Sequence, residues 1–115
     1  MLDELFRVLG IQKILIIYFS YGDKPAVDVL LKKFGIQAKA LYVIPTANTL
    51  PPEVNKYPIV IIIGPRDNPI ISRFIKMGTL PRKDNYIGIV GNMIFIVSSS
   101  PAKTYELVSQ WIQSQ

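Results

Sequence analysis

Apolar residues in this chain are grouped into five short segments whose composition is typical of strands. The segments are rich in β-branched and aromatic residues, and nearly continuous apolar runs predict strands that are buried on both faces of a sheet. The segment Ile59–Ile63 is the most apolar, so we expect it at the sheet centre. The predicted strands are Lys13–Phe19, Ala38–Ile44, Ile59–Ile63, Tyr86–Val90 and Met93–Val97.

Between the strands, apolar residues recur every three or four positions, which is the spacing of one face of a helix. The clearest case is the series Val27, Leu30, Leu31 and Phe34, which Gly35 ends. Two further helices of this kind and a short leading helix are expected. They span Pro69–Met77, Pro101–Ile112 and Leu2–Leu9.

The alternation of strands and helices indicates an α/β fold with right-handed crossover connections. The dipeptide Gly91-Asn92 between the last two strands is typical of a hairpin, so Tyr86–Val90 is expected as an antiparallel edge strand. We predict a three-layer, Rossmann- or flavodoxin-like sandwich with a mostly parallel five-stranded sheet of order 2-1-3-5-4. The 115 residues form one domain, in which residues 1–10 are the leading helix.

Three of the helices begin at the same kind of junction, in which a strand ends in a polar turn and a proline follows. A polar side chain at such a turn caps the free N–H groups of the helix, and proline loses no needed donor there. In open α/β sheets, ligands bind where the parallel strands end, so the three junctions define a candidate site. The junctions are Ser20–Pro25, Gly64–Pro69 and Ser98–Pro101, with Asp23, Asn68 and Ser100 as expected caps.

The junctions carry two basic side chains, Lys24 and Arg66, beside helix N-termini that have a partial positive charge. One interpretation is a site for a small anionic ligand, and the other is that the polar residues only cap helices. Two carboxylates, Asp23 and Asp67, could act as acid and base or bind Mg²⁺, or could belong to the caps. The candidate ligand-binding residues are Ser20, Gly22, Lys24, Gly64, Arg66, Asn68, Ser98, Ser99 and Ser100.

The chain has no cysteine and no histidine. This excludes thiol nucleophiles, Ser–His triads, disulfides and nearly every structural zinc site. Neither a phosphate-binding P-loop motif nor the glycine pattern of dinucleotide-binding folds occurs. The sequence therefore assigns no catalytic residue, no metal ligand and no cofactor, and it favours a non-enzymatic role.

Thirteen basic residues oppose eight acidic ones, which gives a net charge of +5. The basic residues are scattered and no nucleic-acid-binding motif accompanies them, so a mixed-charge surface is favoured over a nucleic-acid interface. The longest apolar runs, Ile14–Phe19 and Ile59–Ile63, are far shorter than the roughly 20 residues that cross a bilayer. The chain also begins without the basic segment of a signal peptide, so a cytoplasmic protein without membrane insertion is expected.

The segment Tyr57–Ile75, which reads YPIVIIIGPRDNPIISRFI, resembles the conserved segment of archaeal S-layer-like α/β domains. In that family a buried strand runs into a G-G-P-x-x-N-P turn and a helix. The chain keeps that turn from Gly64 to Pro69 and has Ile63 where the first glycine stands. Residues 22–28 and 88–104 are similar to further elements of the family, so the resemblance covers about residues 12 to 113. It implies a non-enzymatic binding or assembly module.

A second resemblance is to flavodoxin-like domains, carried by the segments Lys13–Phe34 (KILIIYFSYGDKPAVDVLLKKF) and Pro58–Ile63. Ser20 and Gly22 match the phosphate loop of that family, whereas Asp23 adds a negative charge to it. No aromatic residue is expected in the second or third loop to stack on a flavin. This resemblance implies the alternative function, a small nucleotide- or anion-binding protein that uses the carboxyl edge of the sheet.

We also expect the protein to form a homodimer. The leading helix has a narrow apolar face, the last helix carries Tyr105 and Trp111, and the edge strand Tyr86–Val90 has no charge to protect it from pairing. The alternative is that the loop Thr79–Asn85 folds over this edge and keeps the chain monomeric.

Overall fold

The computed structural model describes residues 2–115. The elements follow the predicted order, and short 3₁₀ segments are added at three connections. The helices and strands are α1 (Leu2–Val8), β1 (Ile14–Tyr18), α2 (Lys24–Phe34), β2 (Ala38–Tyr42), β3 (Ile59–Gly64), α3 (Pro69–Lys76), β4 (Tyr86–Val90), β5 (Met93–Val97) and α4 (Pro101–Gln113). The 3₁₀ segments are η1 (Tyr21–Asp23), η2 (Gly35–Gln37) and η3 (Pro52–Lys56).

Within the described residues, the strands form one five-stranded sheet of order β2-β1-β3-β5-β4. β1 is parallel to β2 and β3, β3 is parallel to β5, and β4 pairs antiparallel with β5. The predicted α/β fold, the strand order and the antiparallel edge strand are therefore confirmed. β3 lies at the centre, where Ile61 is the register partner of both Ile16 and Ile94.

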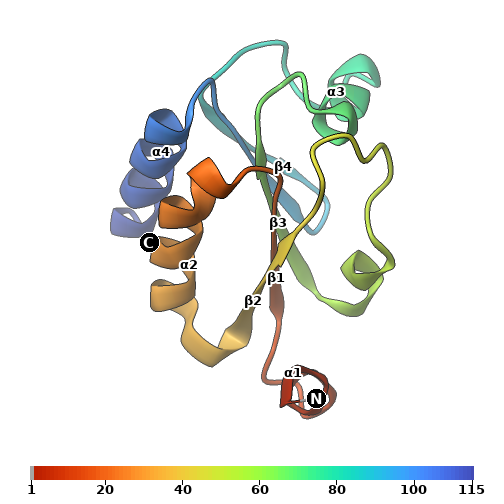
Figure 1. Ribbon diagram of the computed structural model, residues 1–115, viewed down its shortest axis with the longest axis vertical. Helices are drawn as coiled ribbons and strands as arrows, with labels where there is room; N and C mark the ends of the chain where they lie inside the picture. Colours follow the sequence, from red (N-terminus) through yellow and green to blue (C-terminus); the bar gives the residue numbers. More distant parts are fainter. Residues whose placement is uncertain (1) are drawn as a thin grey trace.

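The sheet separates two helical layers (Figure 1). Side chains along a strand alternate between the faces of the sheet, so neighbouring residues enter different cores. Ile16 and Ile61 pack in the core with Val27 of α2 and Val108 of α4. On the opposite face, α3 lies beside the connections that carry η3 and the 77–85 loop, and its Ile71 is fully buried.

The first junction differs from its predicted form. The chain makes the 3₁₀ turn η1 before α2, and the Lys24 N–H donates to the carbonyl of Tyr21. Asp23 makes no capping hydrogen bond, so its predicted capping role is wrong. The Ser20 hydroxyl oxygen instead accepts a 3.1 Å hydrogen bond from Gly22 N–H. The tight turn carries Asp23 inward, where its side chain is buried.

The leading helix α1 lies at the far end of the molecule from the three junctions (Figure 1). Its residues Leu2, Leu5 and Val8 are each at least half exposed. The helix is joined to the rest by a short turn, in which Ile11 N–H donates to the Phe6 carbonyl at 2.8 Å. None of the helices in the described part of the chain is long and apolar enough to span a membrane.

Candidate functional site

Two adjoining cavities lie at the carboxyl edge of the sheet, where the three junctions meet. We call the larger one, of about 530 Å³, the aromatic cavity. We call the smaller one, of about 160 Å³, the hydroxyl cavity. The aromatic cavity is lined by Phe19, Ser20, Tyr21, Gly22, Tyr42, Pro45, Pro65, Asp67, Asn68 and Pro69. The hydroxyl cavity is lined by Ser20, Asp23, Pro65, Ser98, Ser99, Ser100 and Pro101.

Stacked tyrosines form one wall of the aromatic cavity. Tyr18 and Tyr42 are register partners at the ends of β1 and β2, and their rings meet edge to face with centroids 5.5 Å apart. The ring of Tyr21, from η1, stacks on Tyr42 with an interplanar angle of 7° and a centroid distance of 4.4 Å. Tyr21 remains 69% exposed although it makes this stack. The stack therefore holds an accessible aromatic surface in place at the edge of the sheet.

Asn68 fixes the opposite wall. Its Oδ1 accepts hydrogen bonds from the N–H groups of Ile70 at 3.0 Å and Ile71 at 3.3 Å, so the predicted cap of α3 is confirmed. Its Nδ2 donates to the carbonyl of Pro45 at 3.4 Å. One buried side chain thus ties the start of α3 to the segment after β2, and both line the cavity.

Gly64 lies beneath the site and allows these elements to approach one another. A Cβ atom at this position would lie 3.0 Å from Ile71 Cδ1 and 3.1 Å from Phe19 Cδ2, which is closer than side chains normally pack. Gly64 itself is buried. Its role in the site is therefore close packing of α3 and Phe19, and it lines neither cavity.

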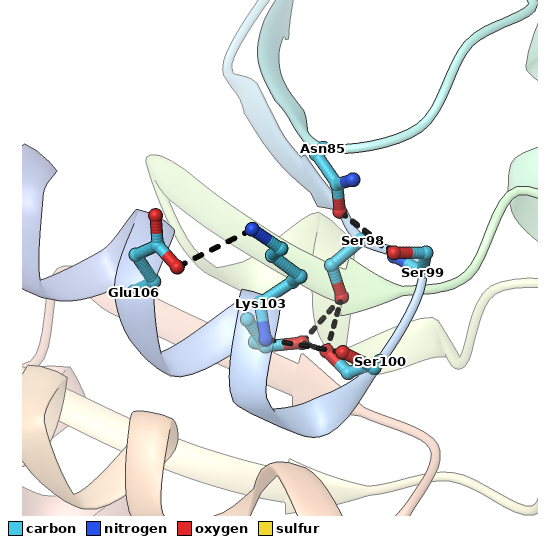
Figure 2. A network of polar contacts seen from close by, with 7 residues as sticks. Asn85, Ser98, Ser99, Ser100, Lys103 and Glu106 are labelled. Carbon is cyan, nitrogen blue, oxygen red and sulfur yellow. Dashed lines mark hydrogen bonds and ion pairs between the residues drawn. The ribbon is translucent and has the colours of Figure 1, made fainter.

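A polar network fills the turn between β5 and α4 (Figure 2). The hydroxyl groups of Ser98 and Thr104 hydrogen-bond to each other. Ser98 Oγ lies 3.2 Å from the Ser100 carbonyl oxygen, and Thr104 Oγ1 lies 3.1 Å from the same oxygen. Ser100 Oγ accepts from Lys103 N–H at 3.2 Å, which confirms the predicted cap of α4.

Asn85 connects this turn to the start of β4. Its Oδ1 accepts hydrogen bonds from Ser99 N–H at 3.0 Å and from the Ser99 hydroxyl at 3.1 Å (Figure 2). Asn85 adopts a positive φ of 63°, a conformation that asparagine tolerates better than most residues. The hydroxyl cavity is therefore held on one side by the loop that precedes β4.

Asp23 is the charged group of the hydroxyl cavity. It is only 5% exposed, and its carboxylate accepts a hydrogen bond from Thr104. Burial raises the pKa of Asp23 above its ordinary value, and the hydrogen bond from Thr104 offsets part of that rise. The buried carboxylate and the hydroxyl groups beside it give this cavity hydrogen-bond acceptors rather than positive charge.

The two basic candidates line neither cavity. Lys24 forms an ion pair with Asp28 one helical turn away, at 2.5 Å. Arg66 lies 3.5 Å from Asp84 and borders an exposed depression with Lys76. Of the remaining candidates, the structure gathers Ser20, Gly22 and Asn68 around the aromatic cavity, and Ser20, Ser98, Ser99 and Ser100 around the hydroxyl cavity.

The aromatic wall is the part of the site that the sequence analysis missed. Tyr18 and Tyr42 end adjacent strands, and Tyr21 follows three residues after Tyr18. Three tyrosines close to strand ends are a usable signal, although Tyr18 and Tyr42 lie within the expected strands and not in the second or third loop. Among residues 2–115 there is no group of three or more carboxylates that could hold a metal ion.

A scan against protein-family models and searches of curated proteins and of solved structures find no match to this chain.

Proposed function

We propose that the protein is a non-enzymatic binding module that takes a small, planar ligand in the aromatic cavity. The observation that carries this proposal is the Tyr21–Tyr42 stack on the wall of a cavity of about 530 Å³. Cavities of roughly 300–1,000 Å³ with mostly apolar linings and a few polar groups are typical small-molecule sites. Aromatic rings prefer offset-stacked or edge-to-face partners, so an exposed tyrosine face suits a flat ring.

The composition of the aromatic cavity supports binding rather than catalysis. Prolines 45, 65 and 69 and the aromatic rings make up most of its lining. Its ionisable carboxylate, Asp67, is exposed and no histidine or cysteine is available to form a nucleophile–base pair. Ser20 and Asn68 supply polar atoms to the lining, although both already take part in capping bonds.

NMR titration of the ¹⁵N-labelled full chain with indole and with adenine tests this proposal. We expect chemical-shift changes in the backbone amides of Ser20–Asp23, Tyr42–Ala47 and Arg66–Asn68. Tyr42→Ala should weaken binding, because the cavity loses the ring on which Tyr21 stacks. Tyr105→Ala is the matched control, since this half-exposed tyrosine lies on α4 outside both cavities. Shifts confined to other surfaces, or no shifts with either probe, would contradict the proposal.

Self-assembly is a second candidate, in line with the resemblance to S-layer-like domains. β4 ends the strand order, carries no charged residue and exposes 73% of Ile89. A second copy would offer the same uncharged edge, and antiparallel pairing about a twofold axis would satisfy both edges at once. The loop before β4 lies against one face of the strand, where Leu80 approaches Gly88.

Sedimentation equilibrium at micromolar concentration tests assembly independently of ligand binding. We expect a dimer that Ile89→Lys dissociates, because a lysine on an edge strand opposes pairing. Ile44→Lys, at another exposed isoleucine beyond the end of β2, should leave the dimer intact. A single species at 13.0 kDa across the concentration range would rule the dimer out.

A further inference from the structure

The aromatic and hydroxyl cavities are neighbouring compartments of one crevice. Ser20 and Pro65 line both of them. Gly22 lies at their boundary, since a Cβ there would come within 3.0 Å of Pro101 Cγ and 3.3 Å of Ser20 Oγ. The absence of a side chain at Gly22 thus keeps the boundary between the compartments thin. The two cavities are therefore adjacent, and at Gly22 they are separated by backbone without a side chain.

The hydroxyl cavity has the dimensions of a subsite. Its volume of about 160 Å³ is below the roughly 300 Å³ at which independent small-molecule pockets begin. It therefore suits one polar substituent of a ligand whose larger part lies elsewhere. Its lining selects that substituent, because the cavity combines one carboxylate with the hydroxyl groups of Ser20, Ser98, Ser99 and Ser100.

Asp23 is buried, and none of the cations in residues 2–115 forms an ion pair with it. The adjacent cation, Lys24, pairs with Asp28 instead, and the hydrogen-bond partner of Asp23 is the hydroxyl of Thr104. Transferring a carboxylate out of water is costly unless it is paired, and an incoming cation would offset that cost. The raised pKa of Asp23 agrees with a carboxyl group whose charged form is under-compensated.

On the basis of the proposed function, we propose that the ligand is a planar ring with a primary ammonium group, whose ring occupies the aromatic cavity and whose ammonium group pairs with Asp23 in the hydroxyl cavity. An ammonium group donates three hydrogen bonds. The Asp23 carboxylate takes one, and hydroxyl oxygens of the serines that line the cavity have lone pairs for the others. The ligand is thus an arylalkylamine, in which an alkyl arm joins the ring to the ammonium group.

An anionic substituent fits these cavities less well. The charged residues in the two linings are Asp67 and Asp23, and both repel an anion. The capping side chains of Asn68 and Ser100 already accept from N–H groups at the starts of α3 and α4, which reduces the donors left for a phosphate or carboxylate. The same linings attract a cation.

Three probes with the same indole ring test the proposal by NMR titration of the full chain. Tryptamine carries an ammonium arm, tryptophol a neutral hydroxyl arm, and indole-3-acetate a carboxylate arm. We expect tryptamine to bind about tenfold more tightly than tryptophol, because charge-assisted hydrogen bonds are roughly twice as strong as neutral ones. Tryptamine should also shift the amides of Ser98–Ser100 as well as those of the aromatic cavity. Indole-3-acetate should bind weakest.

Two matched variants identify the carboxylate that pairs with the ammonium group of the probe. Asp23→Asn should reduce the affinity for tryptamine to that for tryptophol, whereas Asp67→Asn, in the aromatic cavity, should keep the preference. Equal binding of the three probes, or tightest binding of indole-3-acetate, would overturn this inference and leave the proposed function intact. Loss of the preference in Asp67→Asn alone would overturn the role of the hydroxyl cavity. No binding of any probe would overturn both proposals.

Discussion

The aromatic and hydroxyl cavities share two wall residues but are built in different ways. The aromatic cavity is shaped by rigid groups, namely stacked rings and prolines, and the buried residue of its polar lining is the capping residue Asn68. The hydroxyl cavity is shaped by a network in which the side chains of Ser98, Thr104 and Asp23 depend on one another. The aromatic cavity therefore offers the surfaces of rings and prolines. The hydroxyl cavity offers hydrogen-bonding groups that already have partners.

This difference separates the effects of substitutions on stability from their effects on binding. Changes in the hydroxyl cavity should mainly alter the free energy of unfolding, because a buried polar group that loses its partner is destabilising. Changes in the stacked rings should mainly alter ligand affinity, since their outer surfaces contribute little to the folded core.

The largest effect is expected for Thr104→Val. Thr104 is fully buried, and its hydroxyl is the hydrogen-bond partner of both Asp23 and Ser98. Valine should lower the free energy of unfolding by about 2 kcal/mol because it leaves a buried carboxyl group without a donor. Urea denaturation measures this change. Thr104→Ser keeps the hydroxyl and should lose less. Equal losses for the two variants would show that packing of the methyl group, and not the network, holds this cavity.

On the aromatic side, Asn68→Ala should have the next largest effect. The variant loses the cap on Ile70 and Ile71 and the bond to Pro45, and caps of this kind contribute about 1 kcal/mol. We expect a loss of about 1.5 kcal/mol in urea denaturation. Asn68→Asp retains an acceptor for the cap, so its free energy of unfolding should lie between those of the natural sequence and Asn68→Ala. Full stability of Asn68→Ala would mean that the prolines alone hold this wall.

The pH dependence of stability should distinguish the cavities through Asp23. Because the folded state raises its pKa, protonated Asp23 stabilises the fold below its ordinary pKa of 3.8, and this contribution is lost as the pH rises through the folded-state value. Asp23→Asn should therefore gain stability relative to the natural sequence at pH 7 but not at pH 3. Urea denaturation at both pH values measures the difference in free energy of unfolding between Asp23→Asn and the natural sequence. An equal difference at pH 3 and pH 7 would contradict the prediction.

The smallest change in stability is expected for Tyr21→Ala. Its side chain is mostly exposed, so the free energy of unfolding should change by only about 0.5 kcal/mol. Affinity for a planar probe should nevertheless fall several-fold, because an aromatic pair contributes roughly 0.5–1.5 kcal/mol beyond buried area. Parallel denaturation and NMR titration separate the two effects. A large loss of stability with unchanged affinity would show that the Tyr21 ring supports the fold and not the binding of the probe.

Local sequence patterns were enough to predict the strand order and two of the helix caps. Strand order followed from one apolar central segment and one Gly-Asn hairpin, and the caps formed by Asn68 and Ser100 involve only residues two or three positions along the chain. Burial of Asp23 was not predictable in this way, because it depends on Thr104 in a helix about eighty residues later. The Tyr21–Tyr42 stack depends in turn on the register of β1 against β2.

The partners of the basic residues were also predictable only where they lie close together in the sequence. Lys24 and Asp28 are four residues apart on one helix, a spacing that favours pairing and could have been recognised. The ion pair between Arg66 and Asp84 joins distant segments and required the fold. Both basic side chains thus pair with carboxylates, and neither lines one of the two cavities.

Because α3 has only eight residues and is the α-helix that the structure places on its face of the sheet, it is a candidate for local opening. Asn68 anchors its first turn, and the same residue joins the wall of the aromatic cavity. Brief detachment of α3 would dismantle the aromatic cavity while α2 and α4 stay in place on the other face. A ligand that binds only the closed form would then slow hydrogen exchange of the α3 amides. The capping residue would thus couple occupancy of the cavity to the local stability of one helix.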